Sequence, residues 1–287
     1  MALSIGTPSF SHLVSAGRAM TRQVVGPLPG EADGTDLFLV AFPNSGLDWM
    51  ARLYANACLI LAGDRRKVTQ FNLGDLVPEE GLRRPAGSPP LPVPGFRCYS
   101  SHARFTGRYR KVIYLVRDPR RVMADRHAAL VARGQWRGSL EEMVGHRRHG
   151  IRAWAAHAAG WLDHVETPAF ALVRHEDLCA RTAFELTRLF DLLGWHLDPA
   201  QAAQAVARAA EAGWATPDLR RGGEALRRRA EAAPPGAIPF SAMRLIGEVA
   251  GPLMRRLGYL TEPAEAPSPA PGSPAPLVRL FADSSSG

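Results

Sequence analysis

A loop at residues 42–49 has residue types in an order that suits anion binding. It reads FPNSGLDW, follows a short apolar run and precedes a stretch with helical periodicity. A loop that leaves a buried strand and opens a helix presents unpaired backbone N–H groups at the positive end of the helix dipole, which suits a phosphate or a sulfate. Residues Pro43 to Gly46 are also ordinary turn formers, so the loop alone leaves both interpretations open.

Three apolar runs predict the strands that would position this loop and similar polar turns. Leu37–Phe42 precedes the loop, Val112–Val116 precedes the turn Arg117–Arg120, and Ala169–Val173 runs into His175–Asp177. Strands that alternate with helices predict a single-domain, P-loop-like three-layer α/β fold whose mostly parallel central sheet is flanked by helices. Such sheets bind ligands at the carboxyl ends of their strands.

Apolar residues at helical spacing predict the helices that follow the loop and close the domain. The stripe from Trp49 to Ile60 ends at Gly63, and a helix capped by Thr182 and carrying an apolar face over 186–193 ends at Gly194. The segment Met243–Leu257 is amphipathic and predicts a last packed helix.

Composition divides the rest of the chain into segments. Residues 1–35 predict a partly ordered leader, 36–261 the domain, and the Pro-rich stretch 262–287 a disordered tail that could dock a partner protein through a small apolar island. Two irregular segments, 75–95 and 137–149, are expected to set acceptor specificity, the first as a Pro-rich loop of the kind that often covers a substrate.

The composition limits the classes of partner. The 35 Lys+Arg against 27 Asp+Glu leave a charge of +8, which attracts anionic ligands or aids solubility. The arginines are spread out without interleaved aromatic residues, so no specific nucleic-acid interface is expected. Three scattered cysteines predict a reduced, cytoplasmic setting without a metal site. No apolar run reaches the roughly 20 residues of a membrane span.

Four ordered blocks resemble the PAPS-dependent sulfotransferases of the bacterial type. FPNSGLDW resembles the family's Y-P-K-S-G-T-T-W, KVIYLVRDPRRV its K-V-I-Y-L-V-R-D-P-R-D-V, and VRHEDL with DLLGW its V-R-Y-E-D-L block. A fourth block, EVAGPLMRRLGY, matches without change. The resemblance covers residues 36–259, and VRDPR after KVIYL is its most specific element.

The resemblance implies roles for individual residues. In the family, loop amides and a serine hold the 5′-phosphate of the donor, 3′-phosphoadenosine 5′-phosphosulfate (PAPS), an aromatic residue stacks on adenine, and an arginine ending a later strand grips the 3′-phosphate. A histidine after the next strand acts as general base on a small-molecule acceptor. The matching residues are Pro43, Ser45, Gly46, Leu47, Asp48 and Trp49 in the loop, Arg117 for the 3′-phosphate and His102 for the base, with His175 and Arg104 nearby as a stacking side chain and a cation.

Each role has a structural alternative. Trp49 suits a core position, Arg117 an ion pair with Asp118 or Asp177, and a lone histidine such as His102 is commonly structural. The remaining alternatives are a packed side chain for His175 and a solvated surface charge for Arg104.

Several positions depart from the family pattern. Asn44 replaces the loop lysine and keeps only amide hydrogen bonds for catalysis, Leu47 and Asp48 replace threonines, and Ser100 replaces a lysine. Asp125 replaces the serine that helps to hold the 3′-phosphate, and the late R-K-G-x-x-G loop is only partly matched by residues 227–236. A carboxylate at ~4 Å from a phosphate repels it by several kcal/mol at a surface-like dielectric.

Three hypotheses follow. The first is sulfuryl transfer from PAPS to a hydroxyl or amine of a small molecule, with His102 as general base and no metal. The second is a repurposed or catalytically degenerate protein that no longer uses PAPS, with a less anionic ligand or one bridged by a divalent cation at Asp48 and Asp125. The third is a non-catalytic binding module. A homodimer is left open by all three.

Overall fold

Four parallel strands form the centre of the structure. Their hydrogen-bonded order is β2-β1-β3-β4, and every neighbouring pair is parallel. Because the strands are parallel, their carboxyl ends lie along one edge, where Val116 stands beside Arg174. The strands are β1 (Leu37–Ala41), β2 (Cys98–Ser101), β3 (Lys111–Val116) and β4 (Phe170–Arg174).

The structure is a computed structural model that describes residues 36–80, 97–107, 109–164, 170–211 and 238–260. The predicted leader and tail, most of the predicted 75–95 loop and the 227–236 segment lie outside the described residues.

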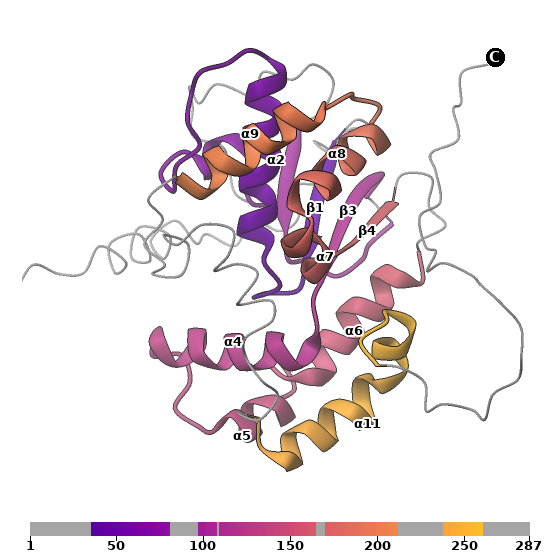
Figure 1. Cartoon of the computed structure of the whole chain (residues 1–287). Helices are drawn as coiled ribbons and strands as arrows, with labels where there is room; N and C mark the ends of the chain where they lie inside the picture. The colour runs from indigo at the N-terminus through magenta and orange to yellow at the C-terminus, as the bar shows by residue number, and fades with distance from the viewer. Residues whose placement is uncertain (1–35, 81–96, 108, 165–169, 212–237, 261–287) are drawn as a thin grey trace, which may run out of the picture.

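Alternate residues of each strand face two different helical layers. In β1, Leu37 and Leu39 belong to one hydrophobic core, whereas Phe38 and Val40 belong to the other. Figure 1 shows the two groups of helices on opposite sides of the sheet, which confirms the three-layer α/β prediction. One group is α2 (Leu47–Leu61), α3 (Leu73–Leu76), α7 (His175–Ala180), α8 (Thr182–Leu192) and α9 (Pro199–Glu211), and the other is α4 (Pro119–Ala132), α5 (Leu140–Gly145), α6 (Ile151–Leu162) and α11 (Phe240–Arg256).

The predicted strands and helices near the loop are confirmed with shifts of a residue or two. β1 ends one residue earlier than predicted, β4 extends to Arg174, and α2 is followed by Gly63 with a left-handed φ of 66°. The last helix begins at Phe240, three residues before its predicted start.

Three local predictions are wrong. Thr182 does not cap α8, because it is the first helical residue and its hydroxyl donates backward to the Cys179 carbonyl (3.4 Å). The predicted irregular segment 75–95 begins inside α3, and its Glu79 forms a bridge to Ser100. The segment 137–149 contains α5, which begins with a capping box in which Ser139 and its N3 glutamate satisfy each other's backbone N–H groups.

Candidate functional site

The 42–49 loop turns from β1 into α2 through two left-handed residues. Asn44 has a φ of 70° and Gly46 a φ of 95°, and the Ser45 amide donates to the Phe42 carbonyl (3.1 Å). Asparagine enters the left-handed region more readily than other residues with a side chain, so Asn44 has a backbone role here. In the first turn of α2 the Trp49 and Met50 amides donate to the Gly46 carbonyl (3.1 and 3.2 Å), which leaves the Leu47 and Asp48 amides at the helix end without a backbone partner among the described residues.

His175 packs directly against this loop. A Cβ atom added to Gly46 would lie 2.3 Å from the His175 Cδ2 atom, so glycine is required by close approach as well as by its φ. The half-buried His175 ring also lies 3.6 Å from the Cys179 Sγ atom. Burial raises the pKa of the Cys179 thiol to about 12, which keeps the sulfur protonated.

Arg117 reaches the loop from the end of β3. Its buried Nη1 atom donates to the Asn44 carbonyl (3.0 Å) and lies 2.7 Å from the Asp125 carboxylate on α4. The loop and the arginine, which are far apart in sequence, are therefore in contact. Asp118 and Asp177 form ion pairs with other arginines, so the ion-pair partner of Arg117 is neither of the two carboxylates considered in the sequence.

Three buried polar atoms of this region have no hydrogen-bond partner among the described residues: Ser45 Oγ, Trp49 Nε1 and Arg117 Nε. Ser45 is 1% exposed. A buried polar atom without a partner costs about 1–3 kcal/mol. The Trp49 indole lies in the core, whereas Ser45 Oγ and Arg117 Nε lie at the loop and can both donate, so the group that would satisfy these two is an acceptor. An anion bound at the loop is such a group.

His102 follows β2 and lies at the same edge of the sheet. Its Nδ1 atom is 2.7 Å from the Ala41 carbonyl, which can only accept, so Nδ1 carries the hydrogen. In the neutral ring this leaves the Nε2 lone pair as proton acceptor, the form that a general base requires. The side chain is exposed, as is that of Arg104.

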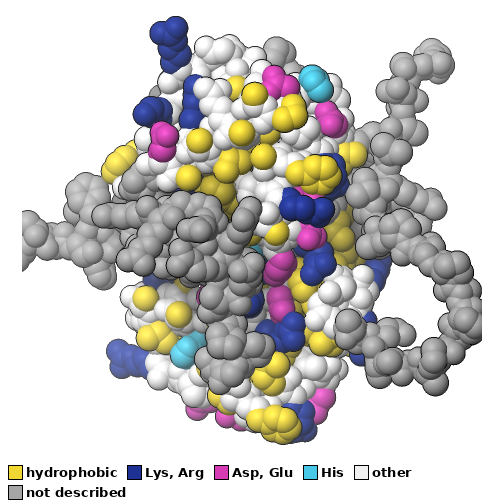
Figure 2. Space-filling model, in the orientation of Figure 1, with side chains coloured by type: hydrophobic (Ala, Val, Ile, Leu, Met, Phe, Trp, Pro, Cys, Tyr) yellow, Lys and Arg dark blue, Asp and Glu magenta, His cyan; other side chains and the backbone are white. Residues whose placement is uncertain are grey.

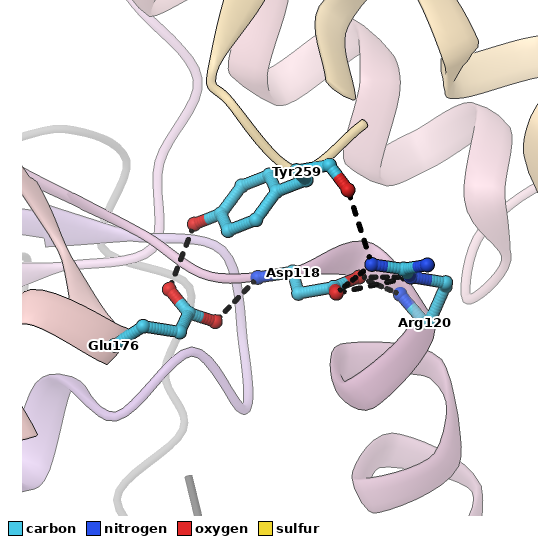
Figure 3. Close-up of polar contacts among 4 residues, drawn as sticks. All are labelled: Asp118, Arg120, Glu176 and Tyr259. Atoms are coloured by element: carbon cyan, nitrogen blue, oxygen red, sulfur yellow. Dashed lines mark hydrogen bonds and ion pairs between the residues drawn. The ribbon is translucent and has the colours of Figure 1, made fainter. Parts of the chain in front are cut away.

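A second set of polar residues, which we call the edge network, ties three chain segments together beside the loop (Figure 3). Glu176 accepts hydrogen bonds from the Asp118 amide (3.0 Å) and the Tyr259 hydroxyl (2.9 Å). Asp118 caps α4, and Arg120 donates to the Asp118 carboxylate (2.6 Å) and the Tyr259 carbonyl (3.2 Å). Burial and the nearby Glu176 carboxylate raise the pKa of Tyr259. The three segments are those that carry the resemblance at 111–122, 173–178 and 248–259.

Comparisons with known proteins identify the fold. A family model described as a sulfotransferase domain matches residues 88–210. The structure is similar to that of a mouse sulfotransferase, SULT7A1, complexed with PAP, at a TM-score of 0.55 and 15% identity over 79% of this chain and 86% of that one. This chain has the sulfotransferase fold. Retinol dehydratase in a complex with retinol and PAP is also similar, at a TM-score of 0.52 and 13% identity over 83% and 84% of the two chains. No curated protein sequence matches this chain.

Within this sulfotransferase fold, two of the predicted loop residues face the core. Leu47 and Trp49 are buried in the core that contains α2 and α8. The Arg52 guanidinium lies 5.0 Å from the Trp49 ring centroid, and burial lowers the pKa of Arg52 to about 10. Asp48 is exposed one turn earlier, and its carbonyl accepts from Arg52 (3.3 Å).

Several residues that support the site carry no signal in the sequence patterns. His157 is buried on α6, 3.0 Å from the Tyr114 hydroxyl, with its ring centroid 5.6 Å from that of Phe42. Burial lowers the pKa of His157 to about 4, so the ring is neutral near pH 7. Arg126 lies over the Phe42 ring at 5.2 Å and donates to the His149 carbonyl (3.1 Å).

The residues fit one end of PAPS better than the other. At the loop, the orphaned Ser45 hydroxyl fits the 5′-phosphate end. At the position expected for the 3′-phosphate, Asp125 already forms an ion pair with Arg117. Among the described residues no group of three or more His, Cys, Asp or Glu side chains is placed to hold a metal ion.

The visible surface has mixed charge. Figure 2 shows basic and acidic side chains next to one another across the middle of this face. In the part of the chain that the structure describes, no helix has the length and apolar character to cross a membrane.

Proposed function

We propose that this chain is a sulfuryl transferase that binds a nucleotide donor at the 42–49 loop and modifies a hydroxyl or amine of a small molecule. PAPS is the donor that the resemblance implies. The observation that carries the proposal is the pair of buried donors at Ser45 and Arg117, which have no acceptor among the described residues. A loop that ends in a helix N-terminus favours an anion at the same place.

The loop residues divide the work of holding the donor. The Ser45 hydroxyl and the amides of Gly46, Leu47 and Asp48 bind the 5′-phosphate, and the Arg117 guanidinium, which contacts the loop at the Asn44 carbonyl, supplies positive charge. The Asn44 amide can donate to the bridging oxygen but supplies no charge there, so we expect slow chemistry compared with a site that has lysine. When bound, PAPS supplies the sulfuryl group.

His102 acts as the general base that takes the proton from the acceptor. The Nδ1 hydrogen bond to the Ala41 carbonyl orients the ring, and Nε2 accepts the proton from the acceptor oxygen or nitrogen as that atom bonds to sulfur. The side chain is exposed, so an acceptor can reach it. Arg104, also exposed, adds a cation close in sequence.

The test uses the reverse reaction, because the natural acceptor is not needed. The full chain is incubated with p-nitrophenyl sulfate and either PAP, which is PAPS without its sulfuryl group, or adenosine 5′-phosphate (AMP), and released p-nitrophenol is measured. We expect His102→Ala to lower the rate by about 100-fold with an unchanged nucleotide Kd, because general acid–base catalysis contributes about that factor. His196→Ala, at an exposed histidine, is the control and keeps the rate. An unchanged rate in His102→Ala would contradict the assignment.

A second candidate function is a sulfotransferase-fold protein that no longer uses PAPS. The Arg117–Asp125 ion pair favours it, because this pair occupies the arginine that would grip the 3′-phosphate. Calorimetry with PAP separates the two: heat of binding at the 42–49 loop, lost in Ser45→Ala, supports PAPS use, and its absence in the folded chain supports the second candidate.

We also propose a cytoplasmic setting. The three cysteines, Cys58, Cys98 and Cys179, are buried and free in the structure, which is compatible with a reducing compartment.

A further inference from the structure

Asp125 saturates one of the two terminal nitrogens of Arg117. The Arg117 Nη1 atom donates to the Asn44 carbonyl (3.0 Å) and to the Asp125 carboxylate (2.7 Å). A terminal guanidinium nitrogen carries two hydrogens, so both are used. Any further anion on Arg117 must bind through its remaining nitrogens.

The negative charge of Asp125 disfavours the binding of a 3′-phosphate at Arg117. The ion pair is held in a part-buried position, with the Arg117 side chain 8% exposed and the Asp125 side chain 32% exposed. A 3′-phosphate at this arginine would lie close to the carboxylate and would have to displace it. A ribose 3′-hydroxyl, by contrast, can donate to the exposed part of that carboxylate, as ribose hydroxyls do to acidic residues in other nucleotide sites.

The position of Asp125 is fixed relative to the loop by its own helix. Asp118 caps the start of α4, and the edge network joins that cap to Glu176. The residue after Asp125, Arg126, lies over the ring of Phe42 at the start of the 42–49 loop. Moving Asp125 away from Arg117 would therefore disturb contacts on both sides of it.

We propose that Asp125 selects nucleotides with a free ribose 3′-hydroxyl, so that the ligand class of this site is a nucleoside 5′-phosphate or 5′-phosphosulfate that lacks a 3′-phosphate. The carboxylate takes the place of the 3′-phosphate on Arg117 and accepts the hydrogen bond of the 3′-hydroxyl. This proposal rests on the nucleotide site of the proposed function and specifies its ligand.

The test compares ligands that differ at one position of the ribose. The full chain is titrated calorimetrically with AMP, with PAP and with 3′-deoxyadenosine 5′-phosphate. The wild-type chain is expected to bind AMP at least as tightly as PAP and about tenfold more tightly than the 3′-deoxy compound. Asp125→Ser is expected to shift the ratio of the two Kd values by tenfold or more in favour of PAP, and Asp125→Asn to shift it in the same direction.

Asp163→Ser is the control for the loss of one negative charge, because Asp163 also pairs with an arginine but on the exposed end of α6. It is expected to leave the ratio unchanged. A wild-type chain that binds PAP more than tenfold more tightly than AMP, with a ratio that Asp125→Ser does not alter, overturns this inference and leaves the proposed function in place. A folded chain that binds none of the three nucleotides overturns both.

Discussion

The edge network and the 42–49 loop lie at the same edge of the sheet but differ in how completely their polar groups are satisfied. In the edge network, the Asp118 carboxylate accepts from the Arg120 side chain, and the Glu176 carboxylate accepts from the Asp118 amide and the Tyr259 hydroxyl. In the loop region, Ser45 Oγ and Arg117 Nε are buried without a hydrogen-bond partner among the described residues. The polar groups of the edge network are thus satisfied by other protein groups, whereas the buried donors of the loop region have no acceptor among the described residues.

The two regions also differ in how closely their residues match the family pattern. The segments that build the edge network match the family pattern closely, whereas the positions that depart from it, such as Asn44 and Asp125, contact Arg117 beside the loop. The segments that match the family pattern thus form the network, whereas these two departures from the pattern lie beside the loop. Substitutions in the network should act on stability, and those in the loop on ligand binding.

The largest expected effect is loss of stability in Glu176→Ala. This change removes the acceptor of the Asp118 amide and of the Tyr259 hydroxyl, and both of those residues are buried. Two buried groups without partners lower the free energy of unfolding by about 4 kcal/mol. Urea denaturation measures the change, and Glu248→Ala, which breaks an exposed ion pair with Arg244, should cost about 0.5 kcal/mol or less. Equal losses in the two variants would contradict the role of the network.

Acid is expected to weaken the packing beneath the loop. The folded pKa of His157, about 4, is below its unfolded value near 6.5, so its contribution is complete above pH 6.5 and is lost as pH falls toward 4. The corresponding loss is about 3 kcal/mol. Urea denaturation at pH 7 and pH 4.5 should show a smaller drop in His157→Gln than in the wild-type chain. An equal drop in the free energy of unfolding in both proteins would show that groups other than His157 cause the acid sensitivity.

Gly46→Ala is expected to act on the contact between the loop and α7. An alanine at this position would have to keep the left-handed backbone, and its methyl group would clash with the His175 ring. Together these two effects should lower the free energy of unfolding by about 2 kcal/mol. Gly63→Ala is a matched control because its φ is also positive and nothing lies near its added Cβ, so it should cost about 1 kcal/mol. Adding His175→Ala to Gly46→Ala should reduce the difference in free energy of unfolding between Gly46→Ala and Gly63→Ala, as measured by chemical denaturation. An unchanged difference would show that the His175 ring is not the cause.

The smallest effect on stability is expected for Ser45→Ala. The hydroxyl has no hydrogen-bond partner among the described residues, so its removal should change the free energy of unfolding by less than about 0.5 kcal/mol while weakening nucleotide binding about tenfold. Ser101→Ala is the contrast, because Ser101 Oγ accepts from the Ala103 amide and contacts Glu80, and its loss should cost about 1–2 kcal/mol. A destabilised Ser45→Ala with unchanged binding would reverse the comparison.

The sequence predicted the parts of the fold that are encoded by local patterns. Apolar runs bounded by polar turns located β1, β3 and β4 to within a residue or two, because buried parallel strands are short and continuously apolar. α9 escaped detection because its buried residues, such as Ala202 and Ala205, are alanines and give little apolar contrast. α6 was also not predicted, although Ile151, Trp154 and Trp161 recur at helical spacing on its buried face.

The site could be predicted as a list of residues but not as a set of contacts. The predicted strands placed Ser45 and Arg117 after strand ends, and the family resemblance implied the same for His102, although β2 itself was not predicted. Parallel strands bring such ends together. The partner of Arg117 could not be deduced, because Asp118 and Asp177 were as eligible by sequence as Asp125. The roles of Glu176 and Tyr259 depend on contacts across more than 80 residues of chain, which no local pattern reports.

A crystal structure of the full chain grown with AMP would show directly which residues hold the nucleotide. We expect the 5′-phosphate within hydrogen-bond distance of the Ser45 hydroxyl and the Gly46 amide, with Arg117 beside it and still paired with Asp125. A nucleotide bound away from the 42–49 loop, with Ser45 and Arg117 still lacking an acceptor, would contradict it.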